Sequence, residues 1–118
     1  MIRTVDQMGT LTYAGFDYRI EDRLLAHLKI AIAAKLRVGE AFLLNWQIPV
    51  DEGSGRVSLW ISPDIPLSFR FSGSKPPEMN RRWLDALARS AHGIRGMVVM
   101  NEDQAAEYVA KAGSPAAP

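Results

Sequence analysis

The sequence predicts an α+β fold: a β-hairpin, a helix, a three-stranded antiparallel meander, a second helix, a short strand and a C-terminal helix. Two observations support this. Apolar and polar residues alternate in several short segments, and apolar residues recur at helical spacing in two longer ones. Alternation is typical of antiparallel strands with one buried face. A length of 118 residues, with 47% hydrophobic residues, fits one globular domain.

The first predicted element is a β-hairpin, over residues 10–13 and 16–20. Polar and apolar residues alternate in both runs, as they do in half-buried strands. Ala14 and Gly15 separate the runs, and the glycine supplies the positive φ that a tight two-residue turn requires. We therefore expect the chain to reverse direction here and the two strands to pair.

The limits of the domain follow from where periodicity starts and stops. Residues 1–8 show no periodicity and predict a flexible leader. Residues 113–118 contain two prolines and predict a flexible tail. Residues 9–112 then form one domain, because no repeat and no long linker divides them.

Residues 21–37 predict an amphipathic helix. Its apolar arc consists of Leu24, Leu25, Leu28, Ala31, Ile32 and Leu36. Glu21 at the start and Arg37 at the end complement the helix dipole, and Gly39 is placed for a left-handed C-terminal cap. Lys35 lies within the apolar arc. Its ammonium either reaches the last helix carbonyls or is held against a carboxylate or phosphate at a site.

Three alternating runs follow, over residues 42–48, 57–61 and 67–71. Their connections are short, so we expect a meander. The helices should pack on its apolar face, which comprises Phe42, Leu44, Trp46, Val57, Leu59, Ile61, Leu67, Phe69 and Phe71. In a simple register the opposite, wetter face comprises Asn45, Gln47, Arg56, Ser58, Trp60, Ser68 and Arg70.

The last third of the chain predicts a helix, a strand and a short helix. Asn80 is a good N-cap for the first helix, which should end near His92. Residues 94–100 are short and apolar and predict a strand. Asn101 and Gln104 have the spacing of a capping box for a helix that runs toward the C-terminus.

Charge and composition exclude several classes. Fourteen Lys and Arg against thirteen Asp and Glu give a net charge of +1, too balanced to predict nucleic-acid binding from charge alone. There is no cysteine, and so no disulfide framework or thiolate site. The longest apolar stretch, residues 24–38, is interrupted by charges and is too short for a membrane span. No signal peptide is visible, so we expect a cytoplasmic protein without a membrane partner.

The sequence lacks the common motifs for catalysis. The sequence has no glycine-rich phosphate loop, no HExxH and no G-x-S-x-G elbow. His27 and His92 lie on different predicted helices, and we expect them to be structural. The sequence therefore predicts a protein that is not an enzyme, with no catalytic residue, cofactor or metal.

Two local features predict a binding surface. Arg81 and Arg82 fall in the first turn of a helix, where cations oppose the dipole unless an anion is bound. Trp60 stands among polar and arginine residues, which is typical of an interface anchor or of a platform for one stacked base. We expect the hairpin or a second subunit to cover Trp60. The candidate binding surface comprises Arg56, Trp60, Arg70, Lys75, Arg81 and Arg82.

Residues 8–99 resemble a known family. The runs MGTLTYAGFDYRIEDRLLAHLKIAIAAKLRVGEAF, GRVSLWISPDIPLSFRFSG and MNRRWLDALARSA are similar to short, uncharacterised actinobacterial proteins often labelled ATP-dependent DNA ligases. Such ligases attach the nucleotide to a lysine in a K-x-D-G pattern. The nearest string begins at Lys35 and has no aspartate before Gly39. We therefore expect no ligase activity.

The element order over residues 21–92 is similar to that of the double-stranded RNA-binding domain, which places basic residues at the start of its second helix. Arg81 and Arg82 occupy that position. The leading hypothesis is nevertheless a small, self-associating binding or protein-interaction module, a homodimer or the partner of another protein. The alternative is an accessory protein that binds nucleic acid through a local basic patch.

Overall fold

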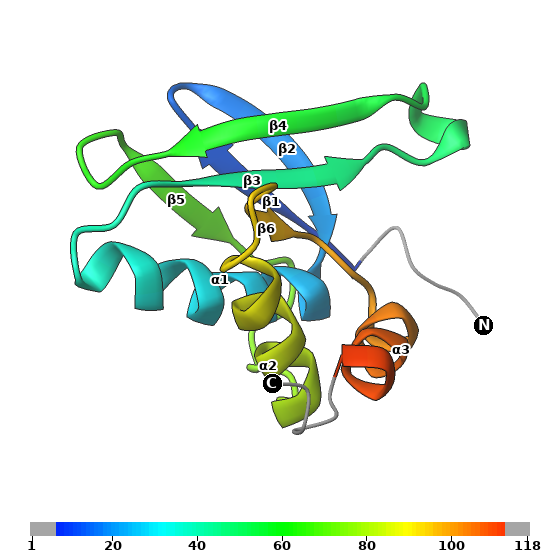
Figure 1. Cartoon of the computed structure of the whole chain (residues 1–118). Helices are drawn as coiled ribbons and strands as arrows, with labels where there is room; N and C mark the ends of the chain where they lie inside the picture. The colour runs from blue at the N-terminus through cyan, green and yellow to red at the C-terminus, as the bar shows by residue number, and fades with distance from the viewer. Residues whose placement is uncertain (1–6, 113–118) are drawn as a thin grey trace.

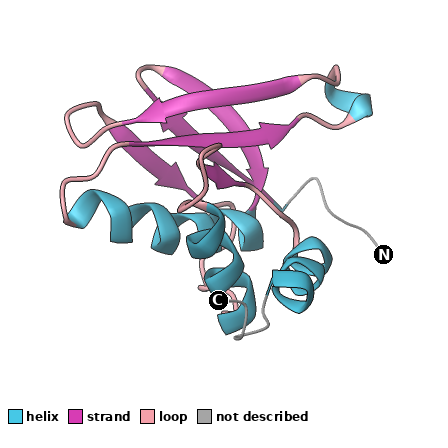
Figure 2. Cartoon of the chain, in the orientation of Figure 1, coloured by secondary structure: helices cyan, strands magenta, loops and turns pink. Residues whose placement is uncertain are grey.

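The computed structural model describes residues 7–112, and the fold is α+β as predicted. The strands lie on one side of the molecule and the three α-helices on the other (Figure 2). The strands are β1 (Met8–Tyr13), β2 (Phe16–Glu21), β3 (Phe42–Gln47), β4 (Arg56–Ile61), β5 (Leu67–Arg70) and β6 (Met97–Val98). The helices are α1 (Asp22–Arg37), the 3-10 turn η2 (Val50–Glu52), α2 (Arg81–Ser90) and α3 (Glu102–Ala112).

The strands form two sheets of three. Sheet A has the order β2-β1-β5, and sheet B has the order β4-β3-β6. The two sheets cross above α1, with α2 beneath that helix (Figure 1). The core fills the space between the inner faces of the sheets and the upper face of α1, where Leu11, Leu28 and Leu44 are fully buried.

The predicted hairpin is confirmed, with both turn residues at positive φ: 54° at Ala14 and 89° at Gly15. This is the turn geometry that matches the twist of the flanking strands. The hairpin begins two residues earlier than expected, because Met8 already pairs with Glu21. Of the predicted leader over residues 1–8, Met8 therefore belongs to β1, and residues 1–6 lie outside the described residues, as does the predicted tail over 113–118.

Helix α1 ends at Arg37 as predicted and begins one residue later than predicted, at Asp22, because Glu21 is its N-cap and the last residue of β2. The Glu21 carboxylate caps its first turn by accepting the backbone N–H groups of Arg23 and Leu24, both at 3.1 Å. At the other end Gly39 has φ of 78° and donates its N–H to the Leu36 carbonyl at 2.9 Å. These bonds satisfy groups that every helix terminus leaves unpaired.

The predicted three-stranded meander is wrong in its third strand. β4 pairs with β3 as expected, but β5 leaves sheet B and pairs with β1, where Arg70 lies opposite Thr10. The third strand of sheet B is instead β6, parallel to β3. The element order is similar to that of the double-stranded RNA-binding domain, but the chain does not adopt that fold, because its three central strands do not form one sheet.

The reason lies in the corner between β4 and β5. The Tyr13 hydroxyl accepts the Ser62 N–H at 2.8 Å and donates to the Trp60 carbonyl at 2.6 Å. One residue on, the Ala14 N–H donates to the Pro66 carbonyl at 3.2 Å. The end of the hairpin thus holds both sides of the corner, and the chain after it continues along β1.

The apolar face predicted for the meander does point inward. Phe42, Leu44 and Ile61 are buried, and the other predicted members are half-buried. Strands β3 and β4 supply six members of this face, and β5 with the residue after it supplies the other three, from a different sheet. Alternation therefore identified the buried side chains correctly, although it assigned them to one sheet.

The C-terminal elements are capped as predicted. The Asn80 side-chain oxygen accepts the N–H groups of Arg82 and Trp83, at 2.9 and 3.3 Å. Asn101 and Gln104 exchange side-chain to backbone bonds of 2.8 and 2.9 Å, a reciprocal capping box at the start of α3. The strand predicted over residues 94–100 shrinks to β6, because the chain is still turning at Gly96, where φ is 93°.

Candidate interaction surface

β4 lies at an open edge of sheet B. The Ile48 N–H donates to the Gly55 carbonyl at 2.8 Å, so Ile48 and Gly55 are a hydrogen-bonded pair. In an antiparallel ladder every second residue forms such a pair, and the residues in between direct their backbone groups to the other side of the strand. In that alternation the backbone groups of Arg56, Ser58 and Trp60 point away from β3. The Tyr13 hydroxyl bond to the Trp60 carbonyl agrees with this direction. Among the described strands, β4 pairs with β3 alone.

The outward face of sheet B presents the Trp60 ring. Trp60 is 58% exposed, so the expectation that the hairpin covers it is wrong within the described chain. The physical reason is that Tyr13 contacts the backbone of Trp60, not its ring. The other group that we expected to cover Trp60 is a second subunit.

The surface next to this ring is held in place by hydrogen bonds. The Ser58 hydroxyl donates to the Asn45 side-chain oxygen at 2.6 Å. The Asn45 amide in turn donates to the Arg95 and Met97 carbonyls, at 2.8 and 3.3 Å. β6 and β4 are thus linked across β3, and Trp60 stands beside a fixed polar row.

The predicted wetter face is split between the sheets. Asn45, Gln47, Arg56, Ser58 and Trp60 lie together on sheet B. Ser68 and Arg70 do not join them, because β5 belongs to sheet A. The prediction of one shared face is therefore wrong, because β5 pairs with β1 and not with β4.

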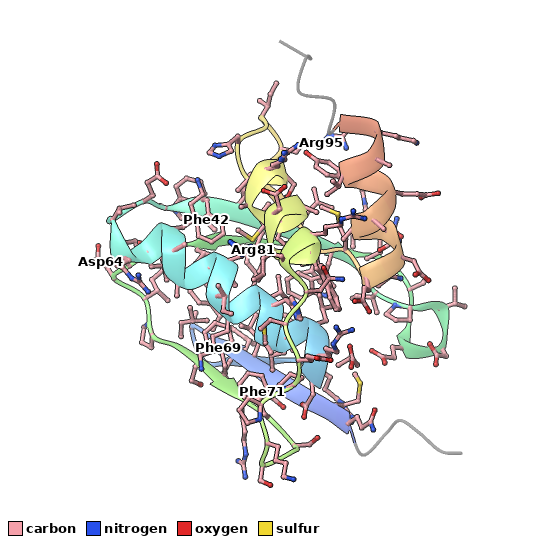
Figure 3. The ribbon with its side chains drawn as sticks, turned by 90° about the horizontal axis from the view of Figure 1, so that it is seen from below. Phe42, Asp64, Phe69, Phe71, Arg81 and Arg95 are labelled. Atoms are coloured by element: carbon pink, nitrogen blue, oxygen red, sulfur yellow. The ribbon has the colours of Figure 1, made fainter. Side chains whose placement is uncertain are left out.

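The predicted basic residues are also dispersed. Arg56 lies on sheet B, Arg70 lies on sheet A, and exposed Lys75 follows β5. Arg81 and Arg82 stand exposed at the start of α2, and neither has an ion pair within the described part of the chain. Figure 3 shows Arg81 at the opposite end of α2 from Arg95.

Lys35 has a carboxylate partner from its own neighbourhood. Its ammonium lies 3.1 Å from a Glu40 carboxylate oxygen, just beyond the C-terminal cap of α1. The Lys35 side chain is 18% exposed, so its methylenes pack on the apolar arc while the charged end reaches outward. The geometry is that of a helix-end ion pair.

A cluster that sequence analysis missed joins the three α-helices. His27 is fully buried, and its ring stacks on Trp83 with 4.2 Å between centroids. Its Nε2 accepts the Asn80 N–H at 2.9 Å, so the proton lies on Nδ1, which donates to the Arg23 carbonyl at 2.7 Å. The ring is therefore neutral in the folded protein.

The Glu102 carboxylate completes this cluster from α3. It pairs with the Arg23 guanidinium and accepts the Asn80 side-chain amide at 2.6 Å. These bonds hold the pKa of Glu102 below its ordinary value. Burial lowers the pKa of His27, an effect only partly opposed by its bond to the Arg23 carbonyl and by Glu102 and Glu21. The partners are up to 79 residues apart, so no local pattern could reveal them.

An open groove lies between the two sheets. Tyr18 of β2 and Trp46 of β3 meet there edge to face, with 5.5 Å between ring centroids. Charged residues of both signs surround the rings, including Arg19 and Asp51. This groove contains aromatic surface, but its mixed charge favours no particular ligand.

The described residues offer no arrangement suited to a bound metal. No group of three or more His, Asp or Glu side chains within residues 7–112 could hold an ion. No described helix has both the length and the apolar character needed to cross a bilayer.

The fold and surface define a small α+β domain with two crossed three-stranded sheets and an exposed aromatic residue on an edge strand. The chain belongs to the family described as Domain of unknown function (DUF7882), whose model matches residues 8–102. The match starts at the first residue of β1 and ends on Glu102, the α3 residue that contacts Arg23 and Asn80. Neither the curated proteins nor the solved structures gave a match.

Proposed function

We propose that this protein is a small non-enzymatic interaction module that self-associates through β4 and the Trp60 ring. One observation supports this above the others: Trp60 is 58% exposed on the outward face of an edge strand. Tryptophan and arginine are enriched among the residues that dominate binding energy at protein interfaces. Arg56 lies on the same strand and the same face as Trp60.

A comparison of the two long open edges favours β4. In β2 the residues that point outward from β1 are Asp17, Arg19 and Glu21, all charged. Charged side chains on an edge discourage pairing with another chain. In β4 the corresponding residues are Arg56, Ser58 and Trp60, of which only Arg56 is charged. β4 is therefore the less protected of the two edges against pairing with another strand.

Light scattering over a range of concentrations tests the proposal. We expect the wild-type chain to form dimers and Trp60→Ala to shift dissociation to at least tenfold higher concentration. Ile94→Ala is the matched control, because Ile94 is 98% exposed and its loss removes a large apolar side chain elsewhere on the surface. A wild-type chain that stays monomeric up to about 1 mM contradicts the proposal.

The alternative function is nucleic-acid binding. The observation that favours it is a basic row on sheet A, where Arg19 and Arg70 both lie opposite Thr10 from neighbouring strands. Neither arginine has an ion pair among the described residues. Binding to labelled duplex or single-stranded oligonucleotides should then weaken steeply with salt, and Arg70→Ala should reduce that dependence. No binding at low ionic strength rules this alternative out.

A further inference from the structure

We propose that two copies of the chain pair their β4 strands antiparallel about a two-fold axis at Ser58. Each Arg56 then lies opposite the partner's Trp60, and the two copies of sheet B become one six-stranded sheet. This inference rests on the proposed self-association and adds the identity of the contacts. The second copy is the occupant because β4 is complementary to itself in this register.

The direction of the backbone groups restricts the register. In an antiparallel pair, two directly opposed residues exchange hydrogen bonds only if both point toward the neighbouring strand. On the open edge of β4 those residues are Arg56, Ser58 and Trp60. An axis at Ser58 opposes Ser58 with its own copy and Arg56 with the partner's Trp60, so every outward-pointing residue finds a counterpart.

Two other axes through these residues are unfavourable. An axis at Arg56 places two guanidinium groups directly opposite each other, and like charges in that position are destabilising. An axis at Trp60 requires the partner's Ser62 to bond to Ser58. The Ser62 N–H already donates to the Tyr13 hydroxyl at 2.8 Å, so it is not free for a second chain.

Axes at the intervening residues are also less suitable. An axis at Val57 places Trp60 opposite the partner's Ser54, where φ is 56° and the chain is not extended. An axis at Leu59 places Arg56 opposite the occupied Ser62 and leaves the Trp60 ring facing a serine. The axis at Ser58 pairs residues 56–60, within the strand as it exists.

The chosen register is complementary on both faces of the sheet. On the outward face each guanidinium lies opposite an exposed indole, and these are the two groups that form a cation–π pair. On the inward face half-buried Val57 lies opposite the partner's Leu59. The Trp60 carbonyl accepts the Tyr13 hydroxyl and keeps a second lone pair for the partner's Arg56 N–H. Because each β4 is used once, the assembly closes at two copies.

Single cysteines report this register directly, because the chain contains no cysteine. Opposed residues that exchange hydrogen bonds have Cα atoms about 5.5 Å apart, within the range of a disulfide. We expect Ser58→Cys to form a covalent dimer on oxidation, while Arg56→Cys and Trp60→Cys alone do not. A mixture of Arg56→Cys and Trp60→Cys chains should form the mixed dimer, which retains one intact Arg56–Trp60 contact.

Prolines separate failure of the register from failure of the interface. Ser58→Pro removes an outward N–H that β3 does not use, so the variant should fold, by circular dichroism, but stay monomeric. Arg19→Pro places the same change on the outer edge of β2 and should leave the dimer intact. A folded Ser58→Pro that still dimerises overturns the proposal.

The remaining outcomes are also decisive. A wild-type dimer that cross-links through Val57→Cys or Leu59→Cys in preference to Ser58→Cys overturns the register and leaves the self-association standing. A wild-type monomer at all concentrations up to about 1 mM overturns both. Equal cross-linking at every cysteine position indicates random collision and also contradicts the register.

Discussion

The imidazole Nε2 of His27 accepts the backbone N–H of Asn80 at 2.9 Å, and this bond ties the buried face of α1 to the N-terminal cap of α2. An imidazolium could not accept that bond, because both of its nitrogens carry protons. The contact therefore depends on a neutral ring. It makes the packing of the two helices sensitive to pH.

The first prediction concerns this pH dependence. The pKa of folded His27 lies below its ordinary value of 6.5, so the unfolded chain binds the proton more readily. The stabilising contribution is complete above pH 6.5 and is lost as the pH falls toward the folded pKa, by at most about 1.4 kcal/mol per pH unit. Urea unfolding measures this loss between about pH 7.5 and about pH 5.5, which are roughly one unit above and one unit below the ordinary value.

Two variants test whether His27 causes this loss of stability at low pH. His27→Gln should be less stable than wild type at pH 7 but should have a flatter pH profile, because the buried titrating group is gone. His92→Gln is the matched control, since His92 is exposed after the end of α2. An unchanged profile in His27→Gln would show that other groups cause the pH dependence.

The second prediction concerns the cap of α2. Asp is as good an N-cap as Asn, yet Asn80→Asp should destabilise the fold by about 1–2 kcal/mol, because it removes the amide that donates to Glu102 and sets two carboxylates together. Glu102→Gln added to Asn80→Asp should recover part of the loss. Thermal unfolding of the two single variants and the double variant gives the coupling. Additive effects would contradict the contact.

The third prediction concerns the close approach of β1 to α1. A Cβ at Gly9 would lie 2.5 Å from the Arg70 carbonyl oxygen and 2.8 Å from a Leu25 methyl. Gly9→Ala should therefore cost about 1–3 kcal/mol of unfolding free energy. Gly73→Ala is the control, because its Cβ would meet Asp22 at 3.5 Å, an ordinary contact. Equal stability of the two variants would contradict the packing described.

The fourth prediction concerns Arg81. Its guanidinium lies in the first turn of α2, which contains no acidic residue. Arg81→Glu should raise stability by about 0.3–1 kcal/mol through the helix dipole. Arg37→Glu, in the last turn of α1, should lower it by a similar amount. If Arg81→Glu is destabilising instead, the arginine has a stabilising contact in solution.

Sequence analysis recovered the elements because their signals are local. The caps at Asn80 and Asn101 and the turn at Gly15 depend on a few adjacent residues. The pairing of β5 with β1 was missed because it depends on one hydroxyl, that of Tyr13, meeting a corner 49 residues away. Short connections made the meander the natural expectation.

The candidate surface was predicted unevenly for the same reason. Trp60 and Arg56 stay together because alternation within one strand fixes their shared face. Arg70 was grouped with them only through a sheet that does not form. The His27 cluster consists of contacts among residues of three helices, and the spacing of residues along the chain does not predict contacts between distant segments.

The strand pairings of the two sheets interleave along the sequence. β1 pairs with β5, and β3, which lies between them, pairs with β6 beyond them. No cut can therefore separate one sheet from the other, and a break in the loop near residue 75 would leave sheet B without β6 and α1 without α2. Two such fragments should be unstructured apart and should fold on mixing. The chain is thus suited to fragment complementation, in which the second fragment supplies β6 to sheet B and α2 to the core.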